Sequence, residues 1–158
     1  MVRTYILKSP EIKNIIDPVN NSCLTAVMNE KRRFKMKYDV KITGLGDMAL
    51  EFLNPDMEMQ FVILFNNDAP AELAELAILH TPGELKEAPA PGDTMRIGEK
   101  TYAITAVGDE AIETLTTLGH CTLAFSADSE PYRPGCIMLD GEVVTAEDVA
   151  NGAVIQIF

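Results

Sequence analysis

Residues 94–107 read Thr94-Met95-Arg96-Ile97-Gly98-Glu99-Lys100-Thr101-Tyr102-Ala103-Ile104-Thr105-Ala106-Val107. Apolar and polar side chains alternate on both sides of Gly98-Glu99-Lys100, which is the pattern of two antiparallel strands joined by a tight turn. On either side of this hairpin the chain continues in short apolar or alternating runs, separated by Gly, Pro, Asn and Asp. The hairpin and its surroundings therefore indicate a β-rich fold.

Further strands are expected at 38–43, 59–65, 76–80, 120–125, 135–139, 142–145 and 153–158. Short helices are expected at 47–53, for one turn within 70–76, and at 109–118. In the last of these, Asp109 is expected to cap the helix, Ile112, Leu115 and Leu118 share one face, and Gly119 supplies the stop. Eight or nine short strands with two or three small helices predict a mainly β fold, either a barrel or a sandwich.

Composition predicts one soluble cytoplasmic domain. The chain has 158 residues, enough for a core of its own. Its apolar runs, such as 61–65, are too short to cross a bilayer, and no segment has the pattern of a secretory signal. The three cysteines, Cys23, Cys121 and Cys136, form no Cys-x-x-Cys motif, which favours a reducing compartment and free thiols. Cys121 and Cys136 lie in strand-like sequence and are expected in the core.

Charge is distributed unevenly along the chain. Residues 1–35 contain seven basic and three acidic residues, a formal +4, whereas residues 36–158 contain six and twenty-one, a formal −15. An acidic body of this kind repels nucleic acid phosphates and anionic lipid heads, so neither is expected as a partner. It attracts a basic protein face, with a salt-dependent strength, although the same charge also serves solubility.

Residues 1–35 differ from the remainder and are expected to form an N-terminal extension, irregular or poorly packed. They end in Lys31-Arg32-Arg33-Phe34-Lys35, and the regular pattern starts at Met36. Because Lys-Arg-Arg can be encoded by a bacterial ribosome-binding sequence, one hypothesis is that translation starts at Met36 and that 1–35 are a translated leader. The alternative is a basic arm that docks on a partner. Residues 36–158 form the expected domain.

His80 is the residue most indicative of chemistry. It ends the apolar run Leu76–His80 and is followed by Thr81-Pro82-Gly83, a stop signal for a strand. An imidazole there changes charge near neutral pH and can carry a covalent adduct as a nucleophile. The alternative is a structural histidine that hydrogen-bonds to a loop.

Three short motifs follow one another from His80 onward. They are His-x-x-Gly-Glu-Leu-Lys at 80–86, Thr-Ala-Val-Gly at 105–108 and Leu-Gly-His-x-Thr-Leu at 118–123. This succession resembles the glucitol/sorbitol-specific IIA components of the bacterial phosphoenolpyruvate-dependent sugar phosphotransferase system (PTS), over about residues 37–158. Family members can carry a second histidine two residues after the active one, and Pro82 stands there in this chain.

The resemblance implies a compact closed barrel and a phosphocarrier whose phosphorylated residue is His80. It implies HPr as the phosphodonor and a cysteine of the IIB/IIC membrane components as the acceptor, for uptake of glucitol or sorbitol. No metal and no other cofactor is expected. For this chemistry we expect an accessible, uncharged ring surrounded by hydrogen-bond donors.

Four supporting residues are predicted around His80: Thr81, Gly83, Glu84 and His120. The turn at 81–84 is expected to supply backbone N–H groups, and Thr81 also a hydroxyl, to phosphoryl oxygens. Glu84 orients the ring or else repels the phosphoryl group. His120 stabilises phosphate or simply packs.

Two other classes of function are left open by the residues. A metal-dependent hydrolase could use His80, Glu84 and His120, although their spacing is not that of a known metal site. A small barrel could also be a binding module without catalysis.

Overall fold

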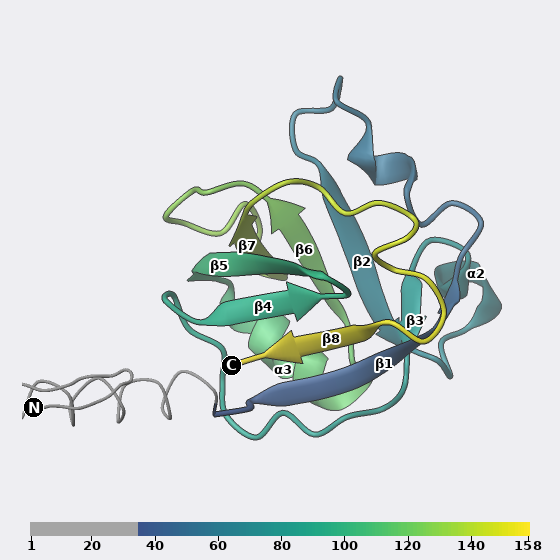
Figure 1. The fold of residues 1–158 in the computed structure, drawn as a ribbon, viewed down its shortest axis with the longest axis horizontal. Helices are drawn as coiled ribbons and strands as arrows, with labels where there is room; N and C mark the ends of the chain where they lie inside the picture. Colours follow the sequence, from purple (N-terminus) through teal and green to yellow (C-terminus); the bar gives the residue numbers. More distant parts are fainter. Residues whose placement is uncertain (1–34) are drawn as a thin grey trace, which may run out of the picture. The chain divides into compact units, whose positions relative to one another are not determined.

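The computed structural model describes residues 35–158, and the predictions for the 1–35 segment lie outside this part apart from Lys35 itself. In these residues eight strands close into a barrel in the order β1-β3-β2-β6-β7-β5-β4-β8, and Figure 1 labels each of them. The strands are β1 (Tyr38–Leu45), β2 (Phe61–Asn66), β3 (Ile78–His80), β4 (Thr94–Ile97), β5 (Lys100–Val107), β6 (Cys121–Phe125), β7 (Cys136–Asp140) and β8 (Val154–Ile157). The predicted mainly β closed barrel with small helices is confirmed.

The predicted hairpin is formed by β4 and β5. Ile97 pairs with Lys100 across the turn, and Met95 pairs with Tyr102. Met95, Ile97, Tyr102 and Ile104 are buried, whereas Arg96 between them is exposed, because side chains alternate along a strand. The alternation seen in the sequence is therefore the inward and outward alternation of the barrel wall.

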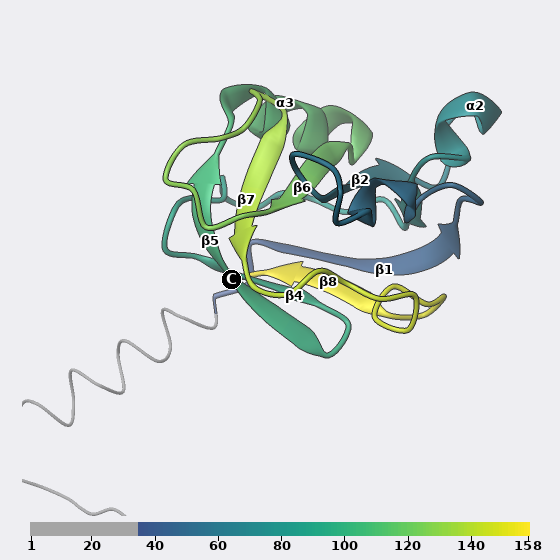
Figure 2. The ribbon, with the colours of Figure 1, turned by 90° about the horizontal axis from the view of Figure 1, so that it is seen from above.

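Two short connections carry helices and place them beside the same strands. Helix α2 (Ala71–Ala74) joins β2 to β3, which pair in parallel, and α3 (Asp109–Leu118) joins β5 to β6. Figure 2 shows α2 and α3 on one side of the barrel, near β2 and β6. This side of the molecule is where the chain returns to the end of β3, at His80.

The main core fills the barrel and includes Cys121, whereas Cys136 lies in a second, smaller buried cluster with Ala106, Ala124 and Met138. The fully buried side chains of the main core include Ile42, Leu123 and Leu139. Cys121 and Cys136 are buried free thiols, as predicted. Burial raises the pKa of Cys121 to about 12, so this thiol stays protonated and packs as a small apolar group.

Three local predictions are wrong. Residues 142–145 form no strand, since β7 is already paired with β5 and β6 and a closed barrel offers no free edge. Within 47–53 the helix is reduced to the 3-10 turn η1 (Glu51–Leu53), because Met48 donates its N–H to Glu75 of the α2–β3 connection. Asp109 does not cap α3; Gly108 is the N-cap residue, and the N–H of Ala111 binds the Pro134 carbonyl.

In the described part of the chain, none of the helices combines the length and apolar character needed to span a membrane.

Candidate functional site

His80 lies at the end of β3 with its ring inside the barrel wall. Its backbone pairs with Ile42 of β1 on one side and with Asn66 of β2 on the other. The residue is 0% exposed, in a part of the fold where Ile78 is also buried. The expectation of an accessible ring is wrong, because the nonlocal pairing of β3 between two strands turns His80 inward.

Both ring nitrogens of His80 lie against backbone carbonyls. Nδ1 is 2.8 Å from the carbonyl oxygen of Thr81, its own neighbour, and Nε2 is 2.8 Å from the carbonyl oxygen of Gly119. The ring is therefore surrounded by acceptors where the sequence led us to expect donors.

The two contacts have a consequence for the protons of the ring. A neutral imidazole carries one N–H and can donate to only one of the carbonyls, whereas the doubly protonated ring donates to both. With the proton on Nδ1 alone, the bond to Thr81 is kept and the lone pair of Nε2 faces the Gly119 oxygen. In this tautomer Nε2 is a free nucleophile, but it faces the electron-rich oxygen of Gly119.

Two further polar groups line the space around the ring, and neither was predicted from the sequence. The Tyr38 ring stands edge-on to His80, with centroids 6.3 Å apart and planes at 85°. The Tyr38 hydroxyl and the Asn66 Oδ1 atom are buried without a hydrogen-bond partner. Burial raises the pKa of the Tyr38 phenol, and the nearby Cys121 raises it further by a smaller amount. The hydroxyl therefore stays neutral.

Gly119 closes this space from the side of α3. It ends the helix in the left-handed conformation, at φ 64°, and donates its N–H to Leu115. A Cβ at this position would collide with Oδ1 of Asn66 and lie 2.8 Å from Cε1 of His80. Because Gly119 has no side chain, the end of α3 can approach the His80 ring. The residue that was predicted to end the helix therefore also covers Nε2 with its carbonyl group.

The hydroxyl of Thr114 fastens the same turn. Its Oγ1 donates to the carbonyl oxygen of His120 over 2.6 Å, and the His120 N–H donates to the Thr114 carbonyl. The turn 118–120 is thus attached to the last two turns of α3. A shift of Gly119 moves this helix end with it.

The three predicted residues of the 81–84 turn contribute differently from what we expected. The Thr81 N–H donates to Lys41 and its hydroxyl accepts from the Lys41 N–H, so both groups are used in holding β1. Gly83 packs against Val40, and Glu84 is exposed. Glu84 was expected either to orient the ring or to repel the phosphoryl group, and the group that lies against Nδ1 is the Thr81 carbonyl.

His120 packs instead of contacting the His80 ring nitrogens. Its ring lies on Phe65, with centroids 4.8 Å apart, and its Nδ1 is 3.1 Å from the Leu64 carbonyl oxygen. Within residues 35–158, no three His, Cys, Asp or Glu side chains are grouped so that they could hold a metal ion. His80, Glu84 and His120 therefore do not form the metal site that a hydrolase would use.

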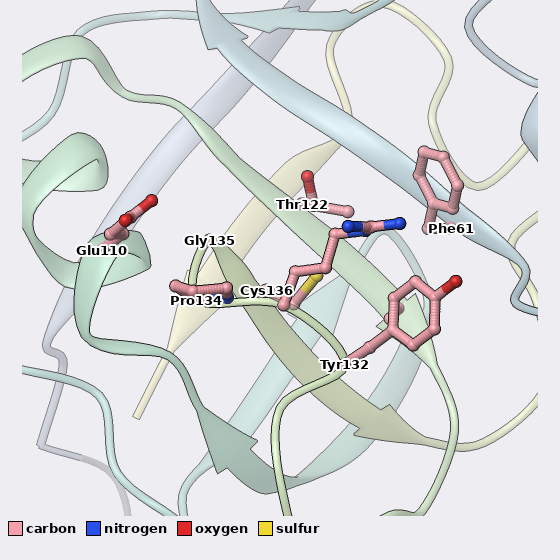
Figure 3. A pocket seen from close by; sticks show the side chains of 9 residues that line it. Phe61, Glu110, Thr122, Tyr132, Pro134, Gly135 and Cys136 are labelled. Atoms are coloured by element: carbon pink, nitrogen blue, oxygen red, sulfur yellow. The ribbon is translucent and has the colours of Figure 1, made fainter.

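A separate pocket of about 270 Å³ lies over β6 and β7. Figure 3 shows Phe61 and Tyr132 on one side of it and Glu110 on the other. The Arg133 guanidinium stacks over the Tyr132 ring at 5.1 Å, so its charge has an aromatic partner. None of the predicted site residues lines this pocket.

Comparisons with known proteins agree on one family. Residues 37–156 match the family model described as "PTS system glucitol/sorbitol-specific IIA component". The chain is 38% identical over 119 residues to the glucitol/sorbitol-specific EIIA components of Escherichia coli K12 and of Shigella flexneri, covering 75% of this chain and 92% of each relative. A crystal structure of a PTS system IIA component from Enterococcus faecalis V583 superposes with a TM-score of 0.58 at 25% identity, covering 74% of this chain and 96% of that one.

Proposed function

Because the chain belongs to the family of PTS glucitol/sorbitol-specific IIA components, which are phosphotransferase phosphocarriers, we propose that His80 accepts a phosphoryl group from HPr and passes it to the IIB component. The observation that carries the proposal is the Nδ1–Thr81 hydrogen bond. It gives the single proton of the neutral ring an acceptor at Nδ1, and with the proton there Nε2 is left as the nucleophile.

The transfer balances as a displacement between two nitrogens. The bond from the donor histidine nitrogen to phosphorus breaks as the bond from His80 Nε2 to phosphorus forms. Nε2 attacks with the lone pair that it has when the ring proton is on Nδ1, and the electron pair of the breaking bond returns to the donor nitrogen. Phosphoryl transfer has a loose transition state, which makes alignment of the two nitrogens the main task of the protein.

The buried ring requires one movement before transfer. The Gly119 carbonyl occupies the side of Nε2 from which phosphorus approaches, so the turn 118–120 shifts to admit the donor. This shift leaves the strands in place, because Gly119 lies outside them and the backbone hydrogen bonds of Gly119 and His120 go to Leu115 and Thr114 of α3.

The Asn66 side chain is suited to contact the transferred group. Its buried Oδ1 has no partner, and the amide can rotate by 180° to present its NH₂ group at the same place. A donor there stabilises phosphoryl oxygens, which the carbonyls of Thr81 and Gly119 do not. The second transfer then moves the phosphoryl group from Nε2 to a cysteine thiolate of IIB. We expect the relay to operate in the cytoplasm, with the polyol bound by the membrane component.

The test is reconstitution with phosphoenolpyruvate, Enzyme I and HPr. The wild type is expected to gain one phosphate that is lost in acid and kept in base, on the peptide that contains His80. His80→Gln is expected to gain none, whereas His120→Gln, the matched change at the second histidine, keeps the label. An unlabelled wild type, or a label that survives in His80→Gln, contradicts the proposal.

A further inference from the structure

An apolar groove of about 280 Å³ lies beside the cover of His80. It is bounded by the two helical connections, α2 and α3, which Figure 2 shows on the same side of the barrel. Its lining residues come from β2, the α2 region and the turn after α3, and they are Ile63, Phe65, Leu73, Leu76, Leu118 and His120. The groove is therefore built by the segments that flank Asn66 and Gly119.

Two leucines on the edges of this groove are unusually exposed. Leu73 is 45% exposed and Leu118 is 47% exposed, whereas Leu115 on the same helix as Leu118 is buried. Leu118 was expected to share the inward face of α3, but the helix ends one turn beyond the core and leaves this side chain outside. Exposed leucines on both sides of an apolar depression are typical of a protein contact surface.

The segment that carries Leu73 and Leu76 of the groove has acidic charges and no basic ones. The segment 66–80 carries Asp68, Glu72 and Glu75, and it contains no Lys or Arg. On α3, Glu113 adds a further acidic residue, whereas Asp109 and Glu110 at the start of the helix line other pockets. A partner that fits this surface has an apolar side chain surrounded by basic residues.

The groove also touches the part that must move for transfer. Leu118 and His120 line it, and Gly119 between them provides the carbonyl that covers Nε2 of His80. Phe65 also lines the groove, and the next residue, Asn66, lies beside the His80 ring with a buried Oδ1 atom. A side chain seated in the groove therefore contacts Leu118 and His120, the two neighbours of Gly119.

We propose that this groove is the docking site of the basic protein that delivers the phosphoryl group, and that seating an apolar side chain between Leu73 and Leu118 moves the Gly119 carbonyl off Nε2 of His80. The proposal rests on the phosphocarrier function above. It explains how a protein donor gains fast access to a fully buried histidine, which a small donor reaches only when the turn 118–120 opens by itself.

The test compares two phosphodonors on the same variants. HPr must dock, whereas phosphoramidate is a small donor that needs no docking surface. Leu73→Glu is expected to slow transfer from phosphorylated HPr by about tenfold or more, because it places a charge in the apolar centre of the contact. Labelling by phosphoramidate is expected to stay within about twofold of the wild type, since Leu73 does not touch the ring.

Tyr132→Glu is the matched control. Tyr132 is 37% exposed and lines the separate pocket over β6 and β7, so its change leaves the groove intact. We expect wild-type transfer from HPr in this variant. Slow transfer in Tyr132→Glu with normal transfer in Leu73→Glu would place the donor at the other pocket and overturn the proposal.

A charge variant tests the complementarity separately. Glu72→Lys combined with Glu75→Lys is expected to slow HPr-dependent transfer at low salt, and the difference from the wild type should shrink as salt is added.

The remaining outcomes separate the docking site from the function itself. If HPr phosphorylates the wild type and Leu73→Glu at equal rates, the docking site is overturned. The labelling of the wild type in the same experiment still supports the phosphocarrier function. A wild type that neither donor labels removes both. A dimer in sedimentation that Leu73→Glu dissociates, with unchanged transfer, shows that a second copy occupies the groove and also overturns the proposal.

Discussion

The Nε2 atom of His80 is held 2.8 Å from the carbonyl oxygen of Gly119, a residue 39 positions later in the chain. The contact joins the end of β3 to the end of α3 and shuts off the nitrogen that we assign to phosphoryl transfer. A carbonyl is a hydrogen-bond acceptor and cannot stabilise phosphoryl oxygens, so the contact belongs to the unphosphorylated protein. Breaking it is the first step of the proposed reaction.

Replacing Gly119 by Ala is expected to destabilise the fold by about 2–4 kcal/mol, as measured by urea unfolding. The residue has φ 64°, and the new methyl group meets Asn66 and His80. Gly152→Ala, at φ 97° with open space around it, isolates the backbone cost and is expected to lose about 1 kcal/mol. Gly135→Ala, also in open space and without a positive φ, is expected to be neutral. Equal losses at Gly119 and Gly152 would mean that no side-chain clash is present.

Replacing Asn66 by Ala is expected to shorten the lifetime of the phosphorylated protein by a factor of about ten, because the proposed donor to the phosphoryl oxygens is lost. Stability is expected to change by less than about 1.5 kcal/mol, since Oδ1 has no hydrogen-bond partner in the unphosphorylated protein. The measurement is the decay of label on purified phosphoprotein at neutral pH. Asn67→Ala, next in the chain and exposed, is the control. An unchanged lifetime in Asn66→Ala would exclude contact with the phosphoryl group.

Asp148 provides a pH-dependent test of the loop before β8. Its Oδ2 accepts from the Thr145 N–H at 2.8 Å and lies 2.8 Å from Lys100 Nζ. Burial alone would raise the pKa of Asp148, but the hydrogen bonds from Lys100 and Thr145 lower it below the usual 3.8. A carboxyl whose pKa is lowered by folding stabilises the protein above its unfolded pKa, and this contribution disappears as pH falls through the folded pKa.

Asp148→Asn is therefore expected to cost about 1–2 kcal/mol near neutral pH, with a difference that vanishes in acid below the folded pKa. Urea unfolding at a series of pH values measures it, with the exposed Asp56→Asn as control. A difference that stays constant with pH would show that the carboxylate charge is not involved.

The two buried thiols are expected to resist alkylation. Burial raises the pKa of Cys121 to about 12, so at about pH 8 its reactive thiolate is a negligible fraction. In a Cys23→Ser background, iodoacetamide should add nothing to the native protein and two groups in urea, as counted by mass spectrometry. Fast labelling of Cys121 without denaturant would contradict its position in the core.

The sequence predicted what depends on neighbouring residues. Alternation gave the β4–β5 hairpin, and Gly119 was recognised as the end of a helix. The strand expected at 142–145 failed because strand formation needs a free edge, and only the complete strand order shows that the barrel has none. Val144 is buried there without being in a strand, so burial alone produced the apolar pattern.

The contacts of His80 could not be predicted from neighbouring residues, because they too depend on segments that are distant in the sequence. Its burial follows from the position of β3 between β1 and β2, and its Nε2 partner comes from the far end of α3. Asn66 could be noticed only as part of a turn, since its register opposite His80 is set by the parallel pairing of β2 and β3. The family resemblance predicted that His80 is phosphorylated, which stays a prediction, whereas the pairing of distant segments determines how the ring is covered.

The closure of the barrel by β8 has a consequence for synthesis. Strand β8 bridges β1 and β4, which are otherwise not adjacent, and it is made more than a hundred residues after β1. A ribosome that has released β1 to β7 has therefore produced every residue around His80 but not the strand that joins the two sides of the wall. Nascent chains arrested before Val154 should be open, sensitive to proteases and unable to hold the histidine in its guarded position.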